Sequence, residues 1–166
     1  FPIIASHLAQ GPTRPKQSAH TEAEVKAKLR PILQEHFVIR EEVTGIYLLK
    51  KQKDRLDFWC FPKPKTIDKG WPAEYFGIEA KGWGDADQHT RTAARLVAQA
   101  IVYRLSECPT EGSGRAYPHF MLIYPSLDLI FQNASSDPVV RAFDEGIRFG
   151  LAKEAAMFRV GELVLN

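Results

Sequence analysis

The sequence lacks the features that would assign it to a specialised class of protein. Its 166 residues include only two cysteines, Cys60 and Cys108, which fit neither a disulfide framework nor a four-cysteine metal or iron–sulfur site. No apolar run approaches the roughly 20 residues that a membrane-spanning helix requires. The formal net charge is only +2, which is too small to indicate nucleic-acid binding by itself. These absences predict a cytoplasmic, intracellular protein with no membrane partner.

Length and composition predict a single domain over residues 21–166, preceded by an irregular leader at 1–20. With 45% hydrophobic and 25% charged residues, such a chain can bury roughly two-thirds of its unfolded surface. The leader is rich in proline and glycine and has no sustained periodicity. Because the chain begins at Phe1 rather than Met, a trimmed chain or a larger parent protein is expected, and a homodimer is also compatible with the sequence.

Hydrophobic periodicity predicts that helices and strands alternate. Helices are expected where apolar residues recur at three- and four-residue spacing, at 21–37, about 87–108 and 137–156. Strands are expected at 38–49, 56–61, 75–83, 119–124 and, as a strand or hairpin, 157–165. The segment 62–72 is a predicted loop. Thr21 and Glu24 predict a capping box, Pro31 predicts a kink or break in the first helix, and Asp137 is the predicted N-cap of the last.

Two neighbouring strands each carry an acid where apolar residues prevail. Glu79 and Lys81 are two positions apart, so both should point to one wet face of the third strand while their neighbours pack on the other. Asp57 is a lone acid in the aromatic strand before it. Burying a carboxylate without a partner costs free energy, so a purely structural role does not account for Glu79 in an apolar strand. Asp57 could instead pair with Arg55, and Lys81 could be a solvated lysine at the strand end.

Gln99 and Tyr103 add a Gln-x-x-x-Tyr element on the following helix. Together with Asp57 and Glu79-Ala80-Lys81, this order resembles the PD-(D/E)XK nuclease superfamily, in its RecB-like branch. The resemblance covers about residues 21–130. It implies an α/β fold with a restriction-endonuclease-like αβββαβ core, in which a central mixed sheet is flanked by helices.

The order of the motifs carries this resemblance, because each motif alone is weak. About 1.3 acid-x-Lys triplets are expected by chance, and a second one, Glu24-Val25-Lys26, is explained by a solvated charged face at a helix start. The Gln-x-x-x-Tyr spacing is rarer, at about 0.2 expected matches.

The resemblance implies a divalent-metal-dependent deoxyribonuclease that hydrolyses phosphodiester bonds in DNA with Mg²⁺ or Mn²⁺. Asp57 and Glu79 are the expected carboxylate ligands, because a hard cation prefers oxygen, and the resemblance adds the backbone carbonyl of Ala80. Lys81 is expected to hold or activate the attacking water, with Gln99 in support. Two carboxylates this close should repel and raise one pKa unless a cation lies between them.

Further candidates flank this set. Arg91, Arg95 and Tyr103 share the face of Gln99 at four-residue steps and are the expected substrate-binding residues, although the same stripe could be the solvent side of the helix. An acid from the first helix is the expected addition to the site, with Glu22 a better match than Glu24. Either acid could instead only stabilise the first turn through the helix dipole.

Two other functions remain compatible with the sequence. One is a non-catalytic nucleic-acid- or protein-binding module that keeps the nuclease fold. The other is an unrelated α/β interaction domain in which the motifs coincide by chance. The basic turn at 50–55 and the lysines of the 62–72 loop could track a nucleic-acid backbone, or be merely solvated.

Overall fold

The computed structural model describes residues 20–84, 88–132 and 137–165, so the predicted leader lies outside the described residues except for His20. The helices are α1 (Glu22–His36), α2 (Pro64–Ile67), α3 (His89–Arg104), α4 (Leu127–Phe131) and α5 (Pro138–Met157). The strands are β1 (Phe37–Tyr47), β2 (Lys53–Pro62), β3 (Phe76–Ala80), β4 (Ser106–Pro109), β5 (Arg115–Ala116), β6 (Met121–Tyr124) and β7 (Val160–Glu162).

The strands form one mixed sheet in the order β5-β4-β1-β2-β3-β6-β7. β1, β2 and β3 pair in antiparallel orientation, whereas β3, β6 and β7 are parallel. The predicted hairpin and third strand are therefore present, as β1, β2 and β3. A mixed sheet covered by helices confirms the predicted α/β class.

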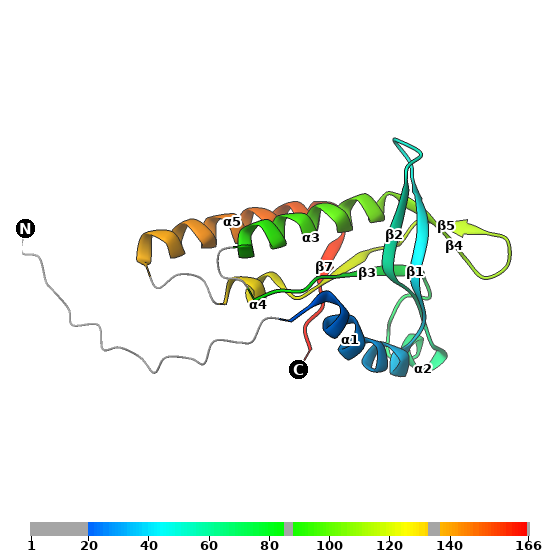
Figure 1. Cartoon of the computed structure of the whole chain (residues 1–166). Helices are drawn as coiled ribbons and strands as arrows, with labels where there is room; N and C mark the ends of the chain where they lie inside the picture. Colours follow the sequence, from blue (N-terminus) through cyan, green and yellow to red (C-terminus); the bar gives the residue numbers. More distant parts are fainter. Residues whose placement is uncertain (1–19, 85–87, 133–136, 166) are drawn as a thin grey trace, which may run out of the picture.

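Helices cover both faces of the sheet. Figure 1 shows α1 on one face and α3 on the other, with α5 packed beside α3. Under α1, Leu29 belongs to the same buried cluster as Phe58 and Ile78. Under α3, Leu96 and Met121 belong to a second cluster. Every residue of β3 is buried as a result, which explains its nearly continuous apolar sequence.

The start of α1 is fixed by the predicted capping box. The backbone N–H of Glu24 donates to the hydroxyl of Thr21 at 3.2 Å, and the Glu24 carboxylate accepts from the backbone N–H of Thr21 at 2.8 Å. The helix then continues through Pro31 to His36, so of the predicted kink or break the break is wrong. Proline removes the hydrogen bond to the carbonyl of Ala27. Ala27 and Pro31 are both exposed, so water can satisfy that carbonyl.

The end of α3 differs from the prediction for a long-range reason. The expected helix to residue 108 stops at Arg104, because Ser106–Pro109 form β4 and pair with β1, with Ser106 opposite Tyr47. Periodicity alone does not reveal this pairing. The short helix α4 was not predicted, and α2 lies in the segment predicted as a loop.

The predicted N-cap of the last helix is confirmed. Asp137 caps α5, since its Oδ1 accepts from the backbone N–H of Val139 at 2.8 Å. Cys60 and Cys108 are both buried and free. Within the described ranges, no helix combines the length and apolar character needed to cross a membrane.

Candidate active site

Asp57 and Glu79 lie on adjacent strands at the centre of the sheet. In the β2–β3 ladder, Phe58 is opposite Ile78, so the register continues to Asp57 and Glu79. Both are buried, at 5% and 1% exposure. The backbone N–H of Ala80 donates to Oδ2 of Asp57 at 2.8 Å. The structure thus brings together the two acids that the sequence singled out.

The ionised form of the Glu79 carboxyl is unfavourable, as expected for one of two neighbouring buried acids. Burial raises its pKa to about 8, and the negative charge of Asp57 adds to the rise, while Lys81 opposes it. Among the described residues, Oε2 of Glu79 has no hydrogen-bond partner. A positive charge placed between these two carboxylates would therefore stabilise the ionised pair.

Lys81 reaches the same side of β3 as Glu79, as strand alternation predicted. Its Nζ lies 3.0 Å from Oε1 of Glu79 and 3.2 Å from Oε2 of Glu22. The predicted wet face is wrong, however, because Glu79 is covered and only Lys81 keeps partial exposure. Two carboxylates raise the pKa of the Lys81 ammonium despite the opposing effect of burial.

Glu22 joins the site because the start of α1 is pinned to the end of β3. His20 and Trp83 exchange backbone hydrogen bonds of 2.7 and 3.0 Å. A Cβ at Gly82 would lie 2.5 Å from the carbonyl oxygen of His20 and 2.8 Å from the nitrogen of Glu22. The absence of a side chain at Gly82 thus permits the approach that brings Glu22 to Lys81. Burial raises the pKa of Glu22, but contacts with Lys26 and Lys81 outweigh it and lower the pKa overall.

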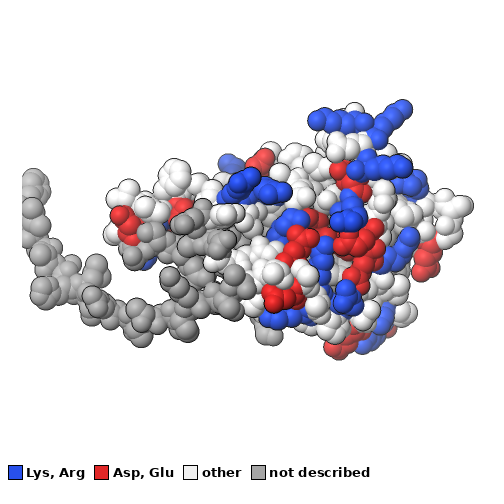
Figure 2. Space-filling model, viewed as in Figure 1, with Lys and Arg blue, Asp and Glu red and all other residues white. Residues whose placement is uncertain are grey.

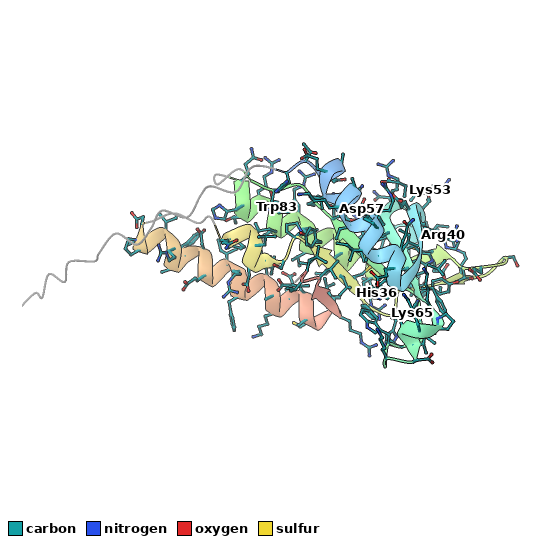
Figure 3. All side chains as sticks on the ribbon, turned by 90° about the horizontal axis from the view of Figure 1, so that it is seen from below. His36, Arg40, Lys53, Asp57, Lys65 and Trp83 are labelled. Carbon is teal, nitrogen blue, oxygen red and sulfur yellow. The ribbon has the colours of Figure 1, made fainter. Side chains whose placement is uncertain are left out.

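Lys26 is a component of the site that sequence reasoning missed. Its Nζ lies 2.5 Å from Oδ1 of Asp57, 2.9 Å from Glu42 and 3.0 Å from Glu22. The side chain is only 14% exposed, so the prediction of a solvated charged face is wrong for this residue. Viewed from below in Figure 3, Asp57 lies beside α1, the helix that carries Lys26. The only sequence signal was the four-residue spacing from Glu22.

The alternative partner for Asp57 is not used. Arg55 binds Glu42 instead, with 2.6 Å between Nε and Oε2. Glu42 therefore holds both Arg55 and Lys26 at the rim of the site.

The predicted stripe on α3 runs from solvent into the core. Arg91 and Arg95 are exposed, Gln99 is half-buried, and Tyr103 is buried, so the solvent-side interpretation is wrong for the last. Burial raises the pKa of Tyr103, with further contributions from the charges of Glu79 and the other nearby acids. Oε1 of Gln99 is buried with no hydrogen-bond partner among the described residues.

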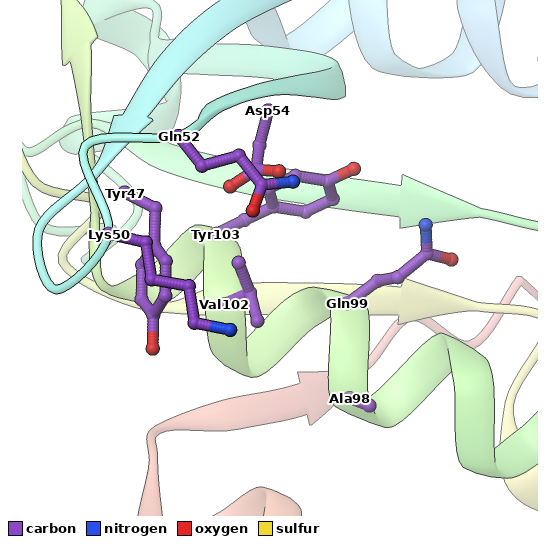
Figure 4. A pocket seen from close by; sticks show the side chains of 8 residues that line it. All are labelled: Tyr47, Lys50, Gln52, Asp54, Ala98, Gln99, Val102 and Tyr103. Carbon is purple, nitrogen blue, oxygen red and sulfur yellow. The ribbon is translucent and has the colours of Figure 1, made fainter.

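Two clefts open on consecutive turns of α3. The first, here called the arginine cleft, has a volume of about 280 Å³ and is lined by Glu22, Lys81, Gly82, Gln88, Arg91, Thr92 and Arg95. The second, the tyrosine cleft, has a volume of about 250 Å³ and is lined by Tyr47, Lys50, Gln52, Asp54, Ala98, Gln99, Val102 and Tyr103. Figure 4 shows Gln99 and Tyr103 projecting from α3 towards the sheet in this cleft. Asp57 and Glu79 line neither cleft.

Basic side chains gather at one end of the molecule. Figure 2 shows Lys and Arg at the tip of the β1–β2 hairpin, and basic and acidic residues intermixed where α1 faces the sheet. Lys50 in the hairpin turn also lines the tyrosine cleft. The hairpin thus presents positive charge beside the tyrosine cleft.

The donor set of the buried pair suits a hard divalent cation. No group of three or more histidine, cysteine, aspartate or glutamate side chains is arranged for a metal within the described ranges. Carboxylates of Asp57 and Glu79 nevertheless offer the oxygen ligands that Mg²⁺ and Mn²⁺ prefer. Oε2 of Glu79 and Oε1 of Gln99 have no hydrogen-bond partner among the described residues, so each could accept a further bond. In the protein without a metal, the ammonium of Lys26 provides the positive charge beside Asp57.

The fold and this site define an α/β protein with a buried carboxylate pair and two lysines. Comparison with protein-family models, curated proteins and solved structures finds no match.

Proposed function

We propose that this protein is a divalent-metal-dependent nuclease of the PD-(D/E)XK type that hydrolyses phosphodiester bonds in DNA. The observation that carries the proposal is the buried pair of Asp57 and Glu79 on adjacent strands, with Lys81 held on Glu79. The element order α1, β1, β2, β3, α3, β6 supports a restriction-endonuclease-like core. Coincidental motifs on an unrelated fold would not be expected to converge in this way.

Asp57, Glu79 and the backbone carbonyl of Ala80 would hold Mg²⁺ or Mn²⁺. When bound, the ion would lower the pKa of a water molecule, orient the phosphate and offset its developing charge. Lys81 is suited to hold the attacking water, because its Nζ is fixed by Glu79 and Glu22 and has partial access to the arginine cleft. Glu22 is the additional acid of the site, and it would keep the Lys81 ammonium in place.

The arginine cleft is suited to bind the DNA backbone. Arg91, Arg95 and Lys81 place three cations around one opening, and Lys81 in turn contacts Glu79. Guanidinium groups match the geometry of phosphate oxygens. Gln99 lies one turn from Arg95 and would support the water or the phosphate through its buried amide. Tyr103 lines the tyrosine cleft together with Gln99 and would contact the substrate there.

A cleavage assay tests the proposal. The protein is incubated with single- and double-stranded DNA and Mg²⁺, Mn²⁺ or EDTA. Metal-dependent cleavage is expected, with a loss of about 10²-fold or more in Asp57→Asn, Glu79→Gln and Lys81→Met. Glu154→Gln and Lys28→Met are matched controls at exposed positions and should keep full activity.

Cleavage that survives in all three site variants would come from a contaminant or another site, and would overturn the assignment. A second candidate, a non-catalytic DNA-binding module, is favoured by the ammonium of Lys26 on Asp57 and by the absence of both acids from the cleft linings. DNA binding without cleavage of any substrate in either metal would support that candidate instead.

A further inference from the structure

The outward face of α5 is apolar from Val139 to Gly150 and again at Met157. Seven residues recur at three- and four-residue spacing and are exposed; this set, called the apolar stripe, is Val139, Ala142, Phe143, Gly146, Phe149, Gly150 and Met157. The large members are among the most exposed hydrophobic side chains, at 78% for Val139, 68% for Phe143, 71% for Phe149 and 76% for Met157. A helix on a protein surface normally turns polar residues outward. Here only Lys153 interrupts the stripe.

Two glycines in the stripe are required neither by packing nor by backbone conformation in the described part of the chain. A Cβ at Gly146 or Gly150 would meet nothing within 4 Å, and neither residue has the positive φ that would require glycine. Glycine is unfavourable in a helix interior because it loses the most conformational freedom. Close approach of another backbone is a physical reason to have glycine at such open positions.

The central part of the stripe, from Ala142 to Gly150, is self-complementary about Gly146, whereas Val139 would meet the partner's Lys153. Phe143 and Phe149 lie three residues to either side of it, and Ala142 and Gly150 lie four residues to either side. In an antiparallel two-fold pair of helices crossing at Gly146, each Phe143 therefore meets the partner's Phe149. Each Ala142 likewise meets the partner's Gly150. A closed two-fold interface requires this reciprocity.

The exposed area of the stripe is sufficient for a weak dimer that forms reversibly. At roughly 70% exposure, each large side chain of the stripe offers roughly 100–150 Å². Together with the small residues, this gives roughly 1,000 Å² for two copies, which reaches the lower limit of specific interfaces. The borders of the stripe carry Glu145 and Glu154, whereas helices that lie on lipid surfaces have mainly basic borders. A second copy of this chain fits better than a membrane.

We infer that α5 forms the interface of an antiparallel homodimer, with two apolar stripes crossing at Gly146. This interface is independent of the nuclease proposal, because none of its residues lines the site or either cleft. Figure 1 shows α5 beside α3, on the opposite side of the sheet from α1, so pairing through α5 would leave α1 uncovered.

Sedimentation of the full chain over about 1 to 200 µM tests the inference, because dimerisation depends on concentration by mass action. A monomer–dimer equilibrium is expected. Gly146→Leu should raise the dissociation constant at least about tenfold, since the new side chain separates the helices while its Cβ meets nothing within 4 Å in its own chain. Ala27→Leu, at an exposed position on α1, is the matched control and should leave the equilibrium unchanged.

The register has its own test. Phe143→Lys and Phe149→Glu should each weaken self-association, whereas mixing the two variants should restore a heterodimer, because the crossing places the introduced ammonium of one chain against the introduced carboxylate of the other. A wild-type chain that stays monomeric over the whole range would overturn the inference. So would a mixture that fails to associate, or flotation of monomers with anionic vesicles, which would identify the stripe as a membrane-binding face.

Discussion

The Nζ atom of Lys26, on α1, lies 2.5 Å from Oδ1 of Asp57, on β2. This ammonium is therefore in the position where a cation would satisfy Asp57. Lys26 also contacts Glu22 and Glu42, which can retain it when it leaves Asp57. Lysine and a divalent ion are thus expected to compete for the same carboxylate.

Lys26→Met is predicted to lower the stability of the metal-free protein by about 2–3 kcal/mol, because Asp57 loses its buried counter-ion. Mn²⁺ should then stabilise the variant more than it stabilises the wild type, since no ammonium competes. Urea unfolding with and without Mn²⁺ measures both effects. Lys28→Met, exposed on the same helix, is the control. Equal Mn²⁺ stabilisation of variant and wild type would show that Lys26 and the metal do not compete for Asp57.

The raised pKa of Glu79 predicts how the free energy of unfolding depends on pH. Its pKa is about 8 in the folded protein, against an ordinary value of 4.5. Between these values the folded state keeps a proton that the unfolded state has released, so this group's contribution to stability falls as pH rises. The slope is about 1.4 kcal/mol per pH unit, for a loss of a few kcal/mol across the window.

Glu79→Gln should remove this slope, because glutamine does not titrate. The measurement is the free energy of unfolding in urea at several pH values between about 5 and 8.5 without divalent metal. Glu145→Gln, on the exposed side of α5, should leave the profile unchanged. A profile that is as steep in Glu79→Gln as in the wild type would assign the proton to another group.

Gly82→Ala should displace the start of α1 from the end of β3. The added methyl would lie 2.5 Å from the carbonyl oxygen of His20, and backbone atoms cannot move aside as a flexible side chain can. A loss of about 1–3 kcal/mol in stability is expected, together with weaker catalysis as Glu22 moves from Lys81. Gly161→Ala is the control, because its methyl would meet only the movable side chain of Leu122 at 3.3 Å. Equal effects at both glycines would contradict the specific role of Gly82.

Local and register-based features of this site could be predicted from the sequence. The capping box of Thr21 and Glu24 needs only residues three apart. The common side of Glu79 and Lys81 follows from strand alternation. The meeting of Asp57 with Glu79 required one further assumption, that β2 and β3 are neighbours, and the family resemblance supplied it.

Contacts between distant elements could not be predicted in the same way. Lys26 reaches Asp57 only because of how α1 is rotated on the sheet, and no periodicity encodes that rotation. The burial of Glu79 likewise depends on the layers above the sheet, so the sequence suggested a wet face instead. Pairing of β4 with β1 ended α3 at Arg104 against its helical pattern, because tertiary pairing can override local preference.

Gln99→Leu separates a structural role from a role in the proposed reaction. Oε1 of Gln99 is buried without a partner among the described residues, so replacing the amide by an apolar group should not lower stability and can raise it. Cleavage should nevertheless fall by about 10-fold or more if the amide orients water or phosphate. Melting temperature and cleavage rate are measured on the same samples, with Gln34→Leu on the exposed side of α1 as control. Unchanged cleavage would remove Gln99 from the site.

Arg91 and Arg95 predict the salt dependence of DNA binding. Each phosphate contact releases counter-ions, so Arg91→Gln and Arg95→Gln should each lower the slope of log affinity against log salt by about one. Binding is measured in the Asp57→Asn background with Ca²⁺, so that affinity is not confused with cleavage. The loss should be similar for every DNA sequence, because these side chains would read phosphates rather than bases. Arg115→Gln on β5 is the matched control; an equal loss of slope there would mean that DNA binds through general surface charge and not through the arginine cleft.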